Sequence, residues 1–178
     1  MKIFVVVGMP ASGKNIARQY AESKGLPYFA TGDLVRREIS RRMLEPNAEN
    51  TAHISTELRG KDGQGVTRLA LSAALESGSP VAFLEGMRSW PEIELIRRQA
   101  DAVVVAFLAP RETRLRRILS RGRPDDLPEH FQERDFREID YGAAVPVALA
   151  DEYILNTGGM EEALRALDEI VKRRTSEK

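Results

Sequence analysis

The stretch "IFVVVGMPASGKNIARQYAES", residues 3–23, decides the fold. Ile3–Val7 is a continuous run of β-branched and aromatic residues, which is typical of a strand buried on both faces of a parallel sheet. Asn15–Ser23 carries apolar or small residues at helical spacing, and Lys24-Gly25 ends it. Between them, Gly8–Lys14 reads G-x-x-x-x-G-K, the P-loop pattern that wraps phosphates. An ordinary glycine-rich turn is the weaker interpretation, because strand, glycines, lysine and helix agree.

The residues of this loop are predicted to bind nucleotide phosphates. Gly8 and Gly13 permit a tight turn, the loop amides point at phosphate oxygens, and the following helix adds its positive N-terminal end. Lys14 supplies a point charge between the outer phosphates. The predicted nucleotide-binding residues here are Gly8, Met9, Pro10, Ala11, Ser12, Gly13, Lys14 and Asn15.

Asn15 departs from the pattern, because a Ser or Thr hydroxyl that holds Mg²⁺ is expected at that position. Its amide oxygen is a hard neutral ligand that Mg²⁺ accepts, directly or through a water. Glu85 ends the apolar run Val81–Glu85 and is the predicted acidic group that orients Mg²⁺ through a water ligand. The predicted cofactors are therefore ATP and Mg²⁺, with Asn15 and Glu85 at the metal.

Composition places the chain among small enzyme domains. Its 178 residues suit a single domain, residues 1–178, with a large buried core. Lys+Arg and Asp+Glu both number 27, so no global field draws the chain to nucleic acid or to an anionic membrane. The absence of cysteine excludes disulfides and thiol catalysis. The N-terminal apolar run is too short for a signal-peptide core and no stretch could span a bilayer, so we expect a cytoplasmic protein.

Short apolar runs alternate with longer amphipathic stretches along the chain. This alternation predicts an α/β fold with a five-stranded parallel sheet and helices on both faces. The predicted strands cover residues 3–7, 26–31, 81–85, 102–108 and 152–155. The predicted helices cover residues 15–23, 33–44, 51–59, 65–77, 91–100, 111–120, 130–141 and 160–173. Pro146 predicts a break after Gly142 and a restart, and residues 173–178 are expected to form a loose tail.

Two long stretches interrupt the alternation of strands and helices. In sheet enzymes of this kind, such insertions usually form flaps over the carboxyl ends of the strands, where ligands bind. We expect residues 33–78 to form a helical acceptor-binding insertion and residues 111–141 to form an arginine-rich lid region.

The motifs in these segments resemble those of nucleoside monophosphate kinases. The P-loop, "TGDLVRR" (31–37), "FLEGMR" (83–88) and "SRGRPDD" (120–126) are similar to their phosphate loop, acceptor-binding segment, strand-end segment and lid start. The combination of GMPxSGK, G-D-x-V-R-R-E, E-L-R, R-G-R-x-D-D, E-R-D-x-R-E and A-D-x-x-I-x-N resembles, more closely, an archaeal P-loop ATP-binding family related to dephospho-coenzyme A kinase. The match spans nearly the whole chain and implies a three-layer P-loop kinase fold, without identifying a substrate.

The arginines of the flaps fit phosphoryl transfer, which needs positive charge around the moving phosphoryl group and exclusion of water. Arg121 and Arg123 resemble lid arginines, and Arg134 and Arg137 lie three apart on one helical face within reach of the same oxygens. The predicted catalytic residues are Lys14, Arg88, Arg121, Arg123, Arg134 and Arg137. A second set is interpreted as a solvated helix surface, namely Arg114, Arg116 and Arg117.

The acceptor is predicted to lie near the end of the third strand. Gly86 lets backbone approach a ligand, and Arg88 grips an acceptor phosphate with Arg36 opposite. Surface pairing with Glu38 or Glu45 is the alternative for Arg36. The predicted substrate-binding residues are Thr31, Asp33, Arg36, Arg59 and Arg88.

Asn156 begins the stretch "NTGG", which by spacing alone is a turn. The resemblance places this loop against the adenine of the nucleotide, so Asn156 completes the predicted nucleotide-binding set.

The role of Asp33 depends on which kind of acceptor receives the phosphoryl group. An anionic phosphate monoester needs no base, whereas a sugar hydroxyl needs a proton acceptor such as this carboxylate. A third possibility is that Asp33 only caps its helix.

The sequence thus predicts an ATP-dependent kinase that acts on a small-molecule phosphate acceptor, either a nucleotide or a nucleotide-like molecule. The alternative is a nucleotide-binding regulatory or assembly module with little turnover, for which Asn15 is the main support. A GTPase is disfavoured, since no N-K-x-D segment follows the fourth strand. Neither a nucleic acid nor a membrane is expected as a partner.

Overall fold

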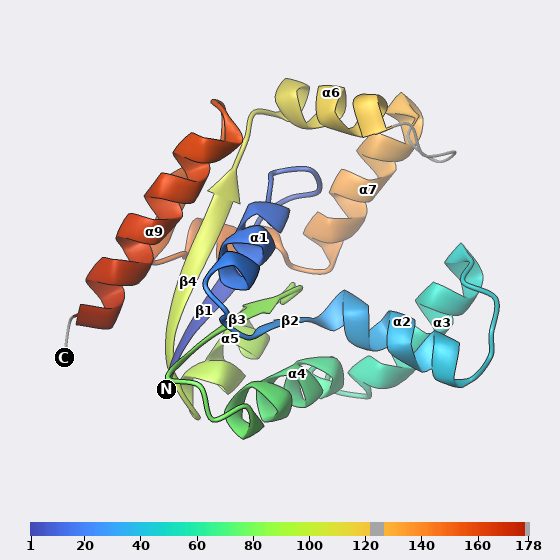
Figure 1. The fold of residues 1–178 in the computed structure, drawn as a ribbon. Coiled ribbons are helices and arrows are strands. Elements are labelled where there is room, and N and C mark those ends of the chain that lie inside the picture. Colours follow the sequence, from blue (N-terminus) through green and yellow to red (C-terminus); the bar gives the residue numbers. More distant parts are fainter. Residues whose placement is uncertain (122–126, 177–178) are drawn as a thin grey trace.

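The computed structural model describes residues 1–121 and 127–176, which fold around one parallel sheet (Figure 1). The five strands stand in the order β2-β3-β1-β4-β5. Their bounds are β1 (Lys2–Val7), β2 (Tyr28–Ala30), β3 (Val81–Glu85), β4 (Asp101–Leu108) and β5 (Glu152–Leu155). The predicted parallel α/β architecture and its five strands are therefore confirmed, but the second strand is shorter than the predicted range 26–31: it covers Tyr28–Ala30, and Thr31 begins a helix.

Helices connect the strands as the alternation predicts. They are α1 (Asn15–Ser23), α2 (Thr31–Arg41), α3 (Ala48–Arg59), α4 (Gly65–Glu76), α5 (Trp90–Arg97), α6 (Arg111–Arg121), α7 (Pro128–Asp140), α8 (Ala144–Ala148) and α9 (Met160–Ser176). The break that Pro146 predicts separates α7 from α8. Within the described ranges, no helix is both long enough and apolar enough to cross a membrane.

The expected loose tail is wrong for residues 173–176, because α9 continues through them. Its last turns are tied to the sheet, since Arg173 and Arg174 both form ion pairs with Glu152 of β5, at 2.8 and 2.6 Å.

Two apolar layers hold the helices on the sheet, one on each face. Helices α1 and α9 cover the face that carries Phe4, Phe83 and Phe107, all fully buried. Helices α4 and α5 cover the opposite face, which carries Val5 and Leu84. Full burial of each such side chain contributes about 1.5–3 kcal/mol, so the sheet forms a rigid base for the loops at its carboxyl edge.

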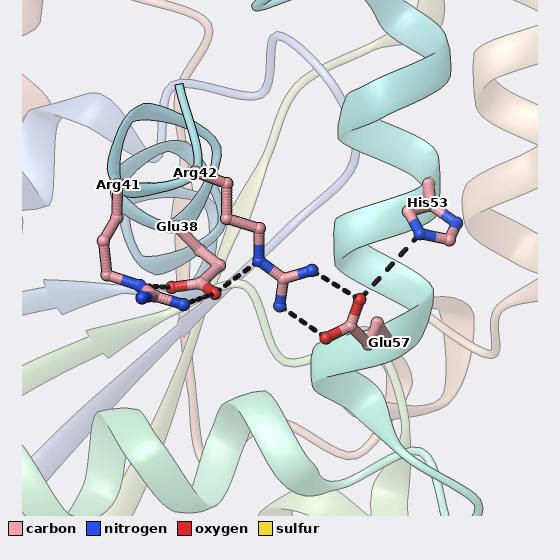
Figure 2. A network of polar contacts seen from close by, with 5 residues as sticks. All are labelled: Glu38, Arg41, Arg42, His53 and Glu57. Carbon is pink, nitrogen blue, oxygen red and sulfur yellow. Dashed lines mark hydrogen bonds and ion pairs between the residues drawn. The ribbon is translucent and has the colours of Figure 1, made fainter. Parts of the chain in front are cut away.

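Helices α2 and α3 project away from the sheet and pack on each other (Figure 1). A small separate core of Val35, Ile39 and Ile54 joins them. Arg42, directly after α2, adds a polar link by bonding Glu38 of α2 and Glu57 of α3 (Figure 2). This pair of helices positions the residues predicted to contact the acceptor.

Candidate active site

The P-loop joins the carboxyl end of β1 to α1, and Lys14 folds back over it. The Nζ of Lys14 donates to the carbonyl oxygens of Gly8, at 2.8 Å, and Met9, at 3.3 Å. Burial lowers the pKa of Lys14, and the negative charges of Glu85 and Glu138 oppose this shift only in part. In the described part of the chain, the hydrogen-bond partners of this lysine are carbonyl oxygens, so its amino group can turn to anionic oxygens of a ligand.

Asn156, just after β5, supports the P-loop by direct contact. Its Nδ2 donates to the carbonyl oxygen of Ser12 at 2.8 Å, and its side chain is buried. Gly13 has a φ of 107°, and a Cβ at this position would overlap the Asn156 amide nitrogen. Both features explain the second glycine of the motif. The role of Asn156 at an adenine stays a prediction, while its contact with the loop is a second, structural role.

Two arginines of α6 also bind the P-loop backbone. Arg114 donates to the carbonyl oxygen of Pro10 at 3.1 Å, and Arg117 donates to that of Ala11 at 3.3 Å. Their interpretation as a solvated surface is therefore wrong, whereas Arg116 is exposed as expected. The turn after β4 directs this face of α6 onto the P-loop, which helical spacing alone does not reveal.

Arg114 also belongs to a buried ion pair between α6 and α7. Its two terminal nitrogens contact the two carboxylate oxygens of Asp135 at 2.6 and 2.7 Å. The guanidinium lies 5.1 Å from the centre of the Phe131 ring. These contacts join the base of the predicted lid region to the P-loop.

A cleft of about 260 Å³, which we name the P-loop cleft, lies between the P-loop, the end of β3 and α2. It brings together several predicted residues from separate segments, because parallel strands end at one edge of the sheet. Thr31 lines it as well. Its charged lining residues are Lys14, Arg18, Arg36, Glu85, Arg88 and Glu138. Four cations against two carboxylates suit an anionic ligand. Sequence reasoning missed Arg18 and Glu138.

Glu85 is the best-placed oxygen donor for a cation in this cleft. The Tyr28 hydroxyl donates to its Oε2 at 2.8 Å, and burial, together with this carboxylate, raises the pKa of Tyr28. Asn15 is exposed and does not line the cleft. In the residues that the structure describes, no group of three metal-ligating side chains gathers. A Mg²⁺ ion that arrives with nucleotide phosphates and takes Glu85 as its protein ligand fits this donor set.

Asp33 is occupied by two arginines. It lies 2.5 Å from Arg18 of α1 and also pairs with Arg36 of its own helix. Burial raises the pKa of the Asp33 carboxyl, but hydrogen bonds and charges from both arginines outweigh this effect and lower it. The helix-cap interpretation is wrong, because Ala30 is the N-cap residue and no side chain caps α2. The proposed pairing of Arg36 with Glu38 or Glu45 is also replaced by this contact.

Gly86 lines the P-loop cleft with its backbone and also packs against the start of α2. Its φ is 102°, and a Cβ there would overlap the Thr31 hydroxyl at the start of α2. Glycine at this position therefore allows β3 to end against α2, which sets the distance between Glu85 and the predicted acceptor-binding helix.

A second cleft, of about 620 Å³, opens between α3 and the end of α7, and we name it the arginine cleft. Its cations are Arg59, Arg88 and Arg137. Arg88 and Glu138 line both clefts. The Nε of Arg88 lies 2.8 Å from the Glu138 carboxylate. The remaining predicted arginines are placed elsewhere: Arg134 is half-buried on α7, Arg121 is exposed at the end of α6, and Arg123 lies outside the described residues.

Comparison with known proteins identifies relatives across the chain. A model described as "AAA domain" matches residues 7–132. A UPF0200 protein of Methanosarcina mazei is 37% identical over 166 residues, which cover 90% of this chain and 89% of the relative. A UPF0200 protein of Thermococcus kodakarensis is 37% identical over 183 residues, which cover 96% of this chain and 99% of the relative.

Solved structures share the fold at lower identity. TT1252 from Thermus thermophilus matches with a TM-score of 0.68 and 20% identity, covering 96% of each chain. Shikimate kinase from Acinetobacter baumannii, solved in complex with shikimate, matches with a TM-score of 0.57 and 17% identity, covering 99% of this chain and 94% of that enzyme. These likenesses show a kinase-like P-loop fold.

Proposed function

The chain belongs to the AAA domain family and to the UPF0200 family, and we propose that it is an ATP-dependent small-molecule kinase. The proposed reaction transfers the γ-phosphoryl group of Mg-ATP to a nucleotide or nucleotide-like acceptor. The observation that supports it best is the P-loop cleft, which brings Lys14 of the P-loop together with Glu85 and Arg88 at the end of β3. A kinase needs such a shared space, because the two substrates must meet in line and away from water.

We assign the nucleotide phosphates to the loop amides and to Lys14. A phosphate would replace the carbonyl oxygens of Gly8 and Met9 as partner of the lysine, and the anionic oxygens offset the cost of burying its charge. When bound, Mg²⁺ neutralises negative charge on the phosphates. Glu85 is the residue that would hold it, directly or through a water.

We assign the acceptor phosphate to Arg36 and Arg88. Asp33 orients Arg36 and Arg18, and its lowered pKa makes it a poor proton acceptor. This favours a phosphate monoester over a sugar hydroxyl as acceptor, since the monoester needs no base. An oxygen of the monoester bonds to the γ-phosphorus, the bond to the oxygen bridging to the β-phosphate breaks, and ADP leaves with that electron pair.

A nucleotide-binding module without turnover is the second candidate, and Asn15 supports it. The position that usually supplies a hydroxyl to Mg²⁺ carries an amide that is exposed and does not line the P-loop cleft. Such a protein would keep the phosphate-binding loop but hold the metal less firmly.

Calorimetry with Mg-ATP, combined with transfer of radiolabelled phosphate to a panel of nucleoside monophosphates and related phosphate monoesters, tests both candidates. A kinase labels at least one acceptor, and the Lys14→Ala protein loses this activity while staying folded by circular dichroism. Tight Mg-ATP binding without labelling of any acceptor favours the module. A wild-type protein that binds no Mg-ATP contradicts both.

A further inference from the structure

We propose that the arginine cleft binds a second oxyanion of the acceptor, a phosphate or carboxylate group that is separate from the oxygen receiving the phosphoryl group. This inference rests on the proposed function, because it defines the chemistry of the acceptor. It predicts an acceptor with anionic groups at two ends, of which one lies in the P-loop cleft and the other beside Arg59 and Arg137.

The charge of the arginine cleft is the first observation. Arg59, Arg88 and Arg137 line it together with a single carboxylate, that of Glu138, which leaves a surplus of two positive charges. Glu138 is already paired with Arg88. Within residues 1–121 and 127–176, no carboxylate lies at ion-pair distance from the guanidinium of Arg59 or Arg137.

Most other arginines of the neighbouring helices are matched with acids. Arg41 and Arg42 pair with Glu38, and Arg36 pairs with Asp33. Two unmatched guanidiniums in one cleft therefore differ from the surrounding surface. A guanidinium presents several donors in a fixed plane, which matches the oxygens of a phosphate or carboxylate.

Tyr141 is the second observation, because its ring holds two of these cations near each other. The guanidinium carbon of Arg59 lies 5.4 Å from the ring centre, and that of Arg88 lies 5.2 Å from it. The two arginines come from different segments, α3 and the loop after β3. Cation–π contact offsets part of their mutual repulsion and limits their motion. A bound oxyanion would remove the remaining repulsion, so the cleft is arranged for a ligand before it arrives.

The position of the cleft is the third observation. It shares Arg88 and Glu138 with the P-loop cleft, so one molecule can extend from one cleft into the other. The neutral wall of the arginine cleft is formed by α3, through small or hydroxyl-bearing residues such as Ala48, Thr51, Ala52 and Ser55. This wall suits the uncharged body of an acceptor, while the arginines take its remote anionic end.

Titration of the full-length protein with inorganic phosphate and, separately, with malonate tests the proposal by calorimetry. Phosphate also enters a P-loop, so two classes of site are expected. Lys14→Ala should weaken phosphate binding at the site formed by the P-loop. The class that belongs to the arginine cleft is weakened roughly tenfold or more by Arg59→Gln and by Arg137→Gln, since each loses a charge-assisted contact. Tighter binding of phosphate than of malonate, or the reverse, identifies the anionic group.

Arg165→Gln is the matched control, because this exposed arginine of α9 lies outside both clefts and loses the same charge. Tyr141→Phe keeps the ring and should leave oxyanion binding close to the wild-type value, whereas Tyr141→Leu should weaken it as Arg59→Gln does. Together, the two Tyr141 variants show whether the ring positions the arginines or whether the hydroxyl group itself contacts the oxyanion.

The proposal is overturned if phosphate and malonate show only the class that depends on Lys14, or if Arg59→Gln and Arg137→Gln bind like Arg165→Gln. Mg-ATP binding is measured on the same samples. Its absence contradicts the proposed kinase function, while oxyanion binding at Arg59 and Arg137 is measured independently of it. The two failures are therefore distinguishable.

Discussion

Arg117 of α6 holds Asn156 at two points. Its Nη2 donates to the Asn156 backbone carbonyl at 2.9 Å and to the side-chain Oδ1 at 3.3 Å. Asn156 in turn donates to the carbonyl oxygen of Ser12 in the P-loop. Helix α6, the residue after β5 and the P-loop are thus joined by hydrogen bonds. Because these three hydrogen bonds tie the buried Asn156 to Arg117 and to Ser12, it cannot move alone, and the shape of the P-loop depends on residues far along the chain.

The first prediction tests how far the hydrogen bond from Asn156 supports the P-loop. Asn156→Ala removes the 2.8 Å donor of the buried Ser12 carbonyl, which keeps a longer bond of 3.5 Å from Arg117, and should destabilise the protein by about 1–3 kcal/mol. Mg-ATP affinity should fall as well, because the loop amides lose their fixed orientation. Thermal unfolding and calorimetry measure the two effects. Arg116→Gln, on the exposed side of α6, should change neither. Wild-type Mg-ATP affinity in a destabilised Asn156→Ala protein would show that the contact serves folding alone.

Much of the candidate site could be predicted from the sequence, because local patterns indicate where the strands end. The P-loop lies where the apolar run stops and the helix begins. Val6 of β1 is in register with Glu85 of β3, so neighbouring parallel strands bring Glu85 to the same edge as Lys14. Two motifs that are more than 70 positions apart are therefore placed together by the predicted sheet alone.

The side-chain contacts that the helices make could not be predicted from the sequence as well. Arg114 and Arg117 belong to a run of arginines whose spacing fits a solvated face, and only the path of the chain after β4 turns them onto the P-loop. Arg18 stands on an amphipathic helix with no motif of its own, yet it reaches Asp33. Tyr141 gives no signal either, because its role depends on where α3 packs. Contacts between residues far apart in the chain are determined by tertiary packing, which local periodicity does not reveal.

The second prediction concerns Lys14, whose burial lowers its pKa. A lysine with a lowered folded-state pKa makes the charged form costly to fold, and the cost fades as pH rises toward the unfolded value of 10.5. Lys14→Met keeps the apolar stem without the charge. It should therefore raise the stability at pH 7 by about 1 kcal/mol while abolishing nucleotide binding.

Thermal unfolding of this variant should be compared at pH 7 and near pH 10, where its advantage over wild type should shrink. Lys61→Met, at an exposed position, provides the control and should show no comparable gain. A lower melting temperature for Lys14→Met at pH 7 would mean that the bonds to the Gly8 and Met9 carbonyls outweigh the desolvation of the charge.

A third prediction tests the buried ion pair between α6 and α7. Asp135→Ala leaves the Arg114 guanidinium charged and buried, so we expect a loss of about 3–5 kcal/mol in unfolding free energy. The double variant Arg114→Met with Asp135→Leu should lose much less, since it leaves no unpaired charge. Denaturant unfolding of Arg114→Met, of Asp135→Leu and of the double variant gives the coupling energy. Purely additive losses would contradict a coupled pair.

The fourth prediction is a pH dependence of the link between α2 and α3 (Figure 2). Hydrogen bonds from Arg41 and Arg42 lower the pKa of Glu38 to about 2, and those from Arg42 lower the pKa of Glu57. A carboxyl with a depressed folded-state pKa stabilises the fold while it is ionised. Its contribution is complete above the unfolded value of 4.5 and is lost as pH falls toward 2.

Arg42→Gln removes the shared partner of both glutamates. Its melting temperature should lie slightly below wild type at pH 7, and the gap should close as pH falls from 4.5 toward 2. These ion pairs lie at the surface, with side chains between 17% and 46% exposed, so 0.5 M salt should also narrow the gap in melting temperature. Arg98→Gln, an exposed arginine at the end of α5, is the matched control. A gap that stays constant with pH would exclude ionisation of the glutamates as its cause.

The last prediction ranks the two metal-ligand candidates, Asn15 and Glu85. Glu85 lines the cleft that contains Lys14, whereas Asn15 is exposed at the first position of α1. Glu85→Gln should therefore reduce phosphoryl transfer far more than Asn15→Ala, because it removes the only acidic group at the end of β3. Asn15→Ser should leave ATP affinity nearly unchanged and strengthen the Mg²⁺ dependence, since a hydroxyl then occupies the usual ligand position. Titration of Mg²⁺ against ATP hydrolysis and transfer in the three variants decides the order. If Asn15→Ser turns an inert wild-type protein into an active kinase, the natural protein is a nucleotide-binding module, because its active-site cleft would then lack only a hydroxyl for the metal.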